Sequence, residues 1–263
     1  MTTALLLLVA VAGIASCARR AIRIDAASNG DVAPARRSPS PRDASLQIVR
    51  IALATRADVV TLTADGEWSL RAADGETPLA LPALGESWVL ERDGARVSAR
   101  RVDSQPVSLR DTPVIARPAD PEGTITFNGR RYRGELEVSA AGSGLLVVDR
   151  VRMDEYIKGV VPLEIGTSAE ADVAAVEAQA VAARSYAFMH LLGPGRPYDM
   201  VATVQDQVYG GVNAETRTGN DAVNATAGLV LFYGDRVVNA PYHANCGGTT
   251  AEAEDAWSTG PEP

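Results

Sequence analysis

The chain has 263 residues, of which 46% are hydrophobic and 22% are charged, a balance typical of globular proteins. Its formal net charge of −8 argues against a nucleic-acid partner, which would require a basic surface. Aromatic residues make up only 5% of the chain, so the core must be built mainly from aliphatic side chains.

An apolar run, Ala4–Ser16, lies near the N-terminus and is followed directly by Cys17. The run is shorter than the roughly 20 residues that a membrane-spanning helix needs, and it is typical of a secretory signal. Because Cys17 follows small residues, the segment resembles a lipobox, and residues 1–17 are predicted to be a lipoprotein signal with Cys17 as the lipidated residue. An ordinary signal peptide is the alternative. We expect an exported protein that is lipid-anchored to a bacterial membrane and faces the periplasm or cell wall.

Residues 18–45 are rich in Ala, Arg, Ser and Pro and show no sustained periodicity, which indicates a flexible tether. From residue 46 to about 152, short alternating runs are broken by Gly, Asp and Pro, which predicts mostly β structure. Asp93-Gly94 and Asn128-Gly129 are strong hairpin signals within it. The β-rich region 46–117 is either a separate small domain or an extension of one sheet.

One long helix is predicted over residues 166–192. Thr167 and Glu170 have capping-box spacing at its start, and Gly193-Pro194-Gly195 cannot continue it. Ala and Val cover most sides, so the helix should be largely buried, and Glu177 and Arg184 within it should have partners, either as structural pairs or as the lining of a cleft. The fold class is therefore α+β, with mostly antiparallel strands and one dominant buried helix.

Four segments stand out in the second half of the chain. They are "YIKGVVPLEIG", which contains Glu164, then "EAQAVAARSYA", "QVYGG" and "YHANCGG". In this order they resemble the SpoIID/LytB family of bacterial sporulation and cell-wall proteins over roughly residues 120–260. The resemblance implies a SpoIID-like catalytic domain over residues 118–263. No strand or helix closes the chain at its last residues, so we expect this domain to be incomplete at its C-terminus.

Glu164 lies between apolar neighbours where a strand is predicted to end. The resemblance implies that it acts alone, first as general acid and then as base, in a lytic transglycosylase that cuts between N-acetylmuramic acid and N-acetylglucosamine. A glycoside hydrolase usually needs a second carboxylate, whereas a lytic transglycosylase uses the C6 hydroxyl of the sugar as nucleophile. Partial burial against Val161, Leu163 and Ile165 would favour the protonated form that an acid needs. A solvated acid at a strand end is the alternative. The usual Met-Pro after the acid is Ile165-Gly166 here.

The other three segments supply the remaining candidate site residues. Those expected to line the floor under the acid are Gln179, Arg184, Ser185 and Tyr186, and those expected to form one wall are Gln207, Tyr209, Gly210 and Gly211. Tyr209 would stack on a sugar ring, and the glycines would let backbone approach the glycan. A tight turn between strands is the alternative for Gly210 and Gly211. His243 would line the cleft.

His243 and Cys246 could bind zinc, as some sporulation members of the family do. Those members carry further ligands before the "QVY" segment, where this chain has Val204-Gln205-Asp206 and no Cys or His. We therefore expect no metal and no cofactor, with Cys246 as a small buried residue before a Gly-Gly turn.

The sequence leaves three functional hypotheses. The first is a lytic transglycosylase that acts on peptidoglycan glycan strands. The second, since the LytB branch enhances an N-acetylmuramoyl amidase, is a non-catalytic glycan-binding protein with a cell-wall amidase as partner. The third is a lipid-anchored structural domain with a degenerate site.

Overall fold

The computed structural model describes residues 41–251, apart from residues 76, 103, 105–107, 111–112, 168–171, 192–194, 235 and 244–246. The predicted signal segment with Cys17, most of the tether, Glu170 of the capping box, Cys246 and the last twelve residues lie outside the described residues. All helices and strands belong to one compact unit, Arg36–Ala244, and residues 247–251 are assigned to a second unit.

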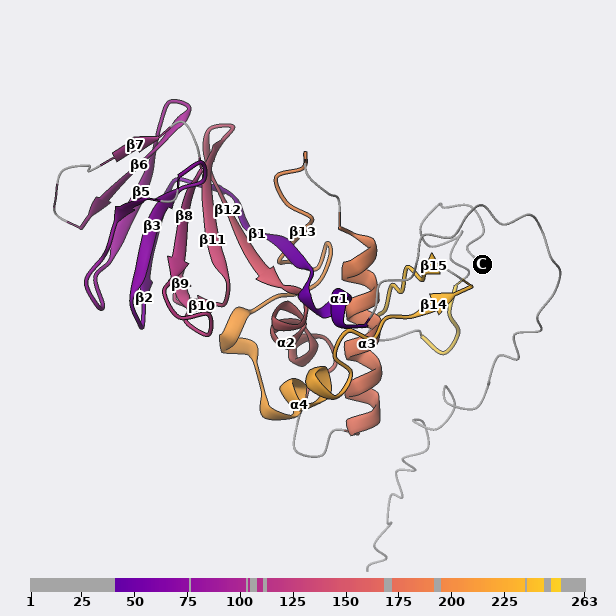
Figure 1. Ribbon diagram of the computed structural model, residues 1–263. Helices are drawn as coiled ribbons and strands as arrows, with labels where there is room; N and C mark the ends of the chain where they lie inside the picture. The colour runs from indigo at the N-terminus through magenta and orange to yellow at the C-terminus, as the bar shows by residue number, and fades with distance from the viewer. Residues whose placement is uncertain are drawn as a thin grey trace, which may run out of the picture. The chain divides into compact units, whose positions relative to one another are not determined.

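The first sheet has seven strands and runs through the centre of the unit (Figure 1). In spatial order they are β13 (Met200–Val201), β1 (Ile48–Ala57), β12 (Gly144–Arg152), β11 (Glu135–Ala141), β8 (Val114–Pro118), β3 (Trp68–Ala72) and β4 (Pro78–Ala80). All neighbours are antiparallel except β1 and β13, which are parallel. The longest strands, β1 and β12, lie side by side next to the helices.

The second sheet has six strands, all of them antiparallel to their neighbours. In spatial order they are β10 (Arg130–Tyr132), β9 (Ile125–Phe127), β2 (Val59–Ala64), β5 (Trp88–Asp93), β6 (Arg96–Arg101) and β7 (Ser108–Arg110). Both predicted hairpins are confirmed. Asn128 and Gly129 have φ values of 50° and 72°, which suit the tight turn between β9 and β10. A further hairpin pairs β14 (Phe232–Tyr233) with β15 (Arg236–Val237).

The strands of the predicted N-terminal region are interleaved with later strands in both sheets. β1 pairs with β12, and β2 pairs with β9, so each sheet combines residues from before and after position 117. β8 itself spans that position. One aliphatic core unites both sheets, including Val49, Leu62, Leu90, Leu136 and Val147. Residues 46–117 are therefore an integral part of these sheets, and the predicted α+β class with mostly antiparallel strands is confirmed.

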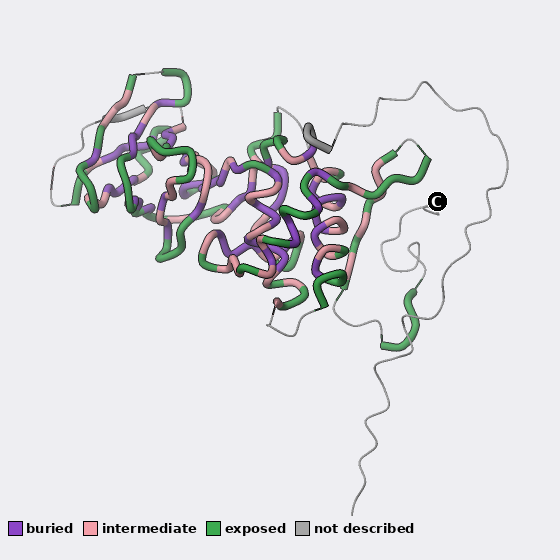
Figure 2. Tube along the Cα trace, turned by 60° about the horizontal axis from the view of Figure 1, so that its bottom comes forward, coloured by how far each residue is buried: buried purple, intermediate pink, exposed green. Residues whose placement is uncertain are grey.

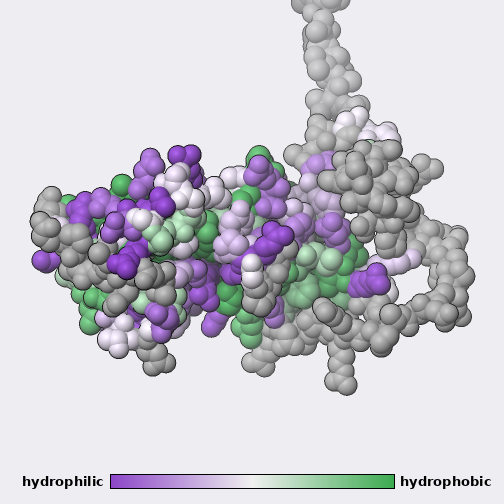
Figure 3. Space-filling model, turned by 90° about the horizontal axis from the view of Figure 1, so that it is seen from above, coloured by the Kyte–Doolittle hydropathy of each residue, from purple (hydrophilic) through white to green (hydrophobic). Residues whose placement is uncertain are grey.

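The helices are α1 (Pro41–Leu46), α2 (Met153–Glu164), α3 (Val173–Met189) and α4 (Arg217–Ala225), with a 3₁₀ turn, η2 (Gly211–Ala214), before α4. α2 follows β12 directly and packs against α3, α4 and η2. The buried stretches run through the strands and the helices, whereas hairpin tips are exposed (Figure 2). Polar residues cover much of the face in Figure 3, with apolar patches between them.

The prediction that "VVPLEI" ends a strand was wrong, because this segment is the last part of α2. The buried positions of α2 are Met153, Tyr156, Ile157, Gly159, Val160 and Val161, which follow helical spacing. Two β-branched residues before Pro162 concealed that period. α4 was also not predicted, since its sequence is polar and contains Gly219.

The predicted long helix is present as α3, but it is shorter than residues 166–192. It begins after Asp172, whose side chain accepts a hydrogen bond from the amide of Ala174. Val173, an apolar residue of a helix that was expected to be largely buried, is 57% exposed in this first turn. Among the described residues, no helix is long and apolar enough to cross a membrane.

Candidate functional site

Glu164 is the last residue of α2 and is half-buried. Its Oε1 accepts a hydrogen bond from the amide of Val208 at 2.8 Å, and its Oε2 has no hydrogen-bond partner in the described part of the chain. The expected apolar shield is incomplete. Val161 faces the core, but Leu163 and Ile165 are 48% and 43% exposed because they lie on the outer side of the helix end. The segment after β13 therefore holds one face of the carboxyl, and the other oxygen is available to a ligand.

Gln207, the residue before Val208, is buried and connects three parts of the fold. Its Oε1 accepts a hydrogen bond from the Tyr156 hydroxyl of α2 at 3.1 Å. Its Nε2 donates to the carbonyl of Ala183 on α3 at 3.2 Å and to the Tyr242 hydroxyl oxygen at 2.9 Å. The segment that holds Glu164 is thereby fixed to both helices and to the start of the "YHANCGG" segment.

Tyr209 does not form the predicted platform for a sugar ring. It is only 2% exposed, and its ring packs against the rings of Tyr156 and Tyr132, with centroids 4.9 and 5.8 Å away. Its hydroxyl donates to Oδ2 of the fully buried Asp149 of β12 at 2.9 Å. Burial raises the pKa of both groups well above their ordinary values. Tyr209 therefore anchors the segment in the core.

The two glycines after Tyr209 are required by close packing. A Cβ at Gly210 would lie 2.6 Å from the Cβ of Ala214, and one at Gly211, where φ is 62°, would lie 2.3 Å from the carbonyl oxygen of Arg131. The amide of Gly210 also donates to the carbonyl of Gly159 on α2 at 3.2 Å. These glycines let the segment lie against α2 as it enters η2, which is a helical turn and not a turn between strands.

Of the α3 candidates, Tyr186 lies in the neighbourhood of Tyr242, with an edge-on ring contact at 6.4 Å. Its hydroxyl donates to Asp206 at 3.4 Å, and its ring stacks on His190. Burial, followed by the charge of Asp206, raises the pKa of Tyr186 to about 12. Gln179 is half-buried, and its Nε2 is enclosed without a hydrogen-bond partner in the described part of the chain.

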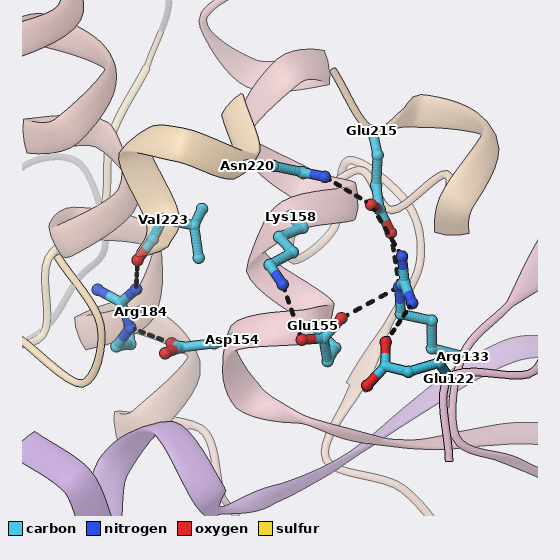
Figure 4. A network of polar contacts seen from close by, with 9 residues as sticks. All are labelled: Glu122, Arg133, Asp154, Glu155, Lys158, Arg184, Glu215, Asn220 and Val223. Carbon is cyan, nitrogen blue, oxygen red and sulfur yellow. Dashed lines mark hydrogen bonds and ion pairs between the residues drawn. The ribbon is translucent and has the colours of Figure 1, made fainter. Parts of the chain in front are cut away.

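Arg184 and Ser185 do not line a floor under Glu164. Arg184 is fully buried, its Nε lies 2.6 Å from Asp154 of α2, and its Nη2 donates to the carbonyl of Val223 (Figure 4). Its Nη1 donates to the carbonyl of Leu229. This confirms the expected partner for Arg184 and gives it a structural role. Ser185 is also buried, and its hydroxyl accepts from the Leu231 amide and donates to a carbonyl of its own helix. Glu177 is half-buried and makes no hydrogen bond or ion pair within the described ranges.

His243 is exposed, and its proposed zinc partner Cys246 lies outside the described residues. Within the described residues, no group of three or more His, Cys, Asp or Glu side chains could hold a metal ion. His243 is therefore not part of a metal-binding group among the described residues.

A charged cluster that the sequence analysis missed lies at the other end of α2. Arg133 contacts Glu122 and Glu155 at 3.1 Å each and Glu215 at 2.9 Å, and Glu155 also pairs with Lys158 (Figure 4). Arg133 and Glu155 border a hollow of about 560 Å³ whose lining does not include Glu164. The lining contains four arginines and four acids, several of which pair with each other, so its formal charges balance.

Residues 141–233 match the SpoIID family, described as stage II sporulation protein. This segment is therefore similar to the SpoIID domain. It contains Glu164, Gln179, Gln207 and Tyr209, and it ends before Tyr242 and His243.

Two curated relatives resemble part of this chain. An uncharacterized protein of Brachyspira hyodysenteriae is 34% identical over 135 residues, which cover 51% of this chain and 36% of that protein. The amidase enhancer of Bacillus subtilis is 37% identical over 103 residues, which cover 39% of this chain and 14% of the enhancer. The chain thus spans well under half the length of either relative. No solved structure matches significantly.

Proposed function

We propose that this protein is a peptidoglycan lytic transglycosylase in which Glu164 is the single general acid and base. The observation that supports this most is the state of its carboxyl group. One oxygen is oriented by the Val208 amide, and the other has no partner among the described residues. A side chain held in this way has a fixed direction and a free oxygen, which is what proton transfer to a bound glycan requires.

The proposed reaction needs no second carboxylate. Protonated Glu164 gives its proton to the glycosidic oxygen, and the bond between that oxygen and C1 of N-acetylmuramic acid breaks. The C6 hydroxyl of the same sugar then attacks C1 and gives its proton to the Glu164 carboxylate. The products are a free 4-hydroxyl on N-acetylglucosamine and a 1,6-anhydro sugar, and Glu164 is again protonated. Asp206, the nearby acid, is engaged by the Val201 amide at 2.7 Å and by Tyr186.

A second candidate is a non-catalytic glycan-binding protein that enhances a cell-wall amidase. It is favoured by the similarity to the amidase enhancer. It is also favoured by the site itself, because Tyr209 and Arg184 serve the core and leave fewer side chains for chemistry. Under either candidate we propose an exported protein, anchored by lipid at Cys17, whose partners are glycan strands and, in the second case, an amidase.

The test uses protein that lacks residues 1–17 and peptidoglycan stripped of its peptides by an amidase. Mass spectrometry would detect 1,6-anhydro products from the wild type and none from Glu164→Gln. The matched control is Glu177→Gln, the same change at a half-buried glutamate of α3, which should cleave normally. If the wild type releases nothing but binds the glycan, the non-catalytic candidate replaces the transglycosylase. Equal cleavage by Glu164→Gln would exclude Glu164 as the acid.

A further inference from the structure

The hydrogen bonds around Gln207 have only one consistent direction. The carbonyl of Ala183 can only accept, so the side-chain atom that faces it must be Nε2. Oε1 therefore faces Tyr156, whose hydroxyl must be the donor. The second hydrogen of Nε2 goes to Tyr242, so the hydroxyl oxygen of Tyr242 is an acceptor in this network. The hydrogen of the Tyr242 hydroxyl therefore takes no part in the bonds around Gln207.

That hydrogen has no acceptor within the described ranges of the chain, and Tyr242 is only partly buried. Burial raises the pKa of Tyr242, and the charges of Glu164 and the phenol of Tyr186 raise it further, whereas the bond from Gln207 acts in the opposite direction. The phenol therefore stays protonated across the neutral range. Tyr242 is a permanent donor whose acceptor must come from outside the network.

Tyr242 and Glu164 are held by consecutive residues. The side chain of Gln207 binds the first, and the amide of Val208 binds the second. Tyr156, on the same helix as Glu164, donates to Oε1 of the same Gln207 whose Nε2 donates to Tyr242, so Gln207 links Tyr242 to that helix. The carboxyl group of Glu164 and the hydroxyl group of Tyr242 are thus both held by one short segment, Gln207 and Val208.

We propose that Tyr242 binds the glycan by donating a hydrogen bond to one of its uncharged oxygens, a hydroxyl or an acetamido carbonyl, while that glycan lies at Glu164. This rests on the proposed function, since it takes the ligand to be a glycan. Tyr242 lies nine residues beyond the end of the SpoIID match, so the family comparison assigns it nothing. It is a substrate-binding residue for either candidate function.

Tyr242→Phe tests the proposal because it removes the hydroxyl and keeps the ring against Tyr186. The Kd for peptide-free glycan strands would be measured by titration calorimetry in the Glu164→Gln background, where no turnover occurs. One neutral hydrogen bond predicts affinity weaker by about two- to tenfold. Tyr233→Phe, the same change at an exposed phenol of β14, should leave the Kd unchanged. The thermal unfolding midpoint of each variant would be measured as well, since a purely structural role would lower the midpoint without changing the Kd of the folded protein.

Equal Kd values for Tyr242→Phe and its parent would overturn this inference and leave the proposed function intact. If the parent and the wild type both fail to bind the glycan, the proposed function and the inference fall together. If the glycan binds but is never cleaved, only catalysis is refuted, and the comparison of Kd values still decides the role of Tyr242.

Discussion

The amide of Val208 and the carboxyl of Glu164 join the segment after β13 to the end of α2 through a 2.8 Å hydrogen bond. Neither residue is fixed by that bond alone. Gln207 on one side of Val208 is bonded to both helices, and Tyr209 on the other side is inserted into the core. The residues on either side of Val208 therefore help to determine the position of the proposed catalytic carboxyl. Substitutions in this segment should change the stability of the protein or the position of that carboxyl.

Tyr209→Phe should destabilise the protein although it keeps the ring. The fully buried Asp149 would lose the hydroxyl that donates to its Oδ2, and its Oδ1 already has no partner among the described residues. Leaving a buried acceptor unsatisfied costs about 1–3 kcal/mol in the free energy of unfolding. Urea unfolding at neutral pH measures this, with Tyr233→Phe as the exposed control. Equal stability of the two variants would contradict the anchoring role.

Asp149→Asn should change how stability depends on pH. Because burial raises the folded-state pKa of Asp149, the folded protein holds this proton at pH values where the unfolded chain has lost it, above about 4. Stability should therefore fall as pH rises from about 4 through the folded pKa, and this contribution should be absent in the variant. Urea unfolding from pH 4 to 8 would show the wild type losing stability relative to Asp149→Asn as pH increases. A constant difference between the two would refute a raised pKa.

Arg184→Met should strongly lower the free energy of unfolding and should have no direct effect on glycan binding. The substitution removes the buried partner of Asp154 and two hydrogen bonds to carbonyls, and breaking a buried pair costs about 3–5 kcal/mol. Arg217→Met, at a 96% exposed side chain in a loose pair with Asp221, should cost under about 1 kcal/mol. Chemical unfolding compares the two. If Arg184→Met folds normally but no longer binds glycan, that result would instead support the prediction that Arg184 lines the site under Glu164.

Gly210→Ala should disturb the site through packing. The new methyl group would lie 2.6 Å from the Cβ of Ala214 and 3.0 Å from a methyl of Leu163, the residue before Glu164. Such overpacking costs about 1–3 kcal/mol, and it should lower cleavage by pushing the end of α2 from the Val208 amide. Gly66→Ala, which meets no atom within 4 Å, is the control for stability and activity. Unchanged cleavage by Gly210→Ala would show that the segment tolerates displacement.

The sequence predicted the elements whose signals are local. The hairpins at Asp93-Gly94 and Asn128-Gly129 follow from turn chemistry, and α3 follows from its Ala-rich period. It could not predict α2, because Val160 and Val161 favour strands in isolation and become helical only by packing against the sheets.

The candidate site was harder to predict than the fold. The motif that contains Tyr209 indicated an important residue, but not that its ring would be buried among other tyrosines. Whether a polar side chain faces a ligand or the core depends on partners distant in sequence, such as Asp149, which lies 60 residues before Tyr209. Tyr242 stood at the start of a recognised motif, yet its free hydrogen follows only from the bonds of Gln207.

The interleaved sheets determine which fragments of this chain can exist alone. The SpoIID match begins at residue 141, the last residue of β11, so it contains the long strand β12 but neither of the strands that pair with it. Excised by itself, residues 141–233 would present two unpaired strand edges to solvent, a template for self-association. Residues 141–233 are therefore not an independent folding unit, and a shortened form of this protein must also contain β1 and β11.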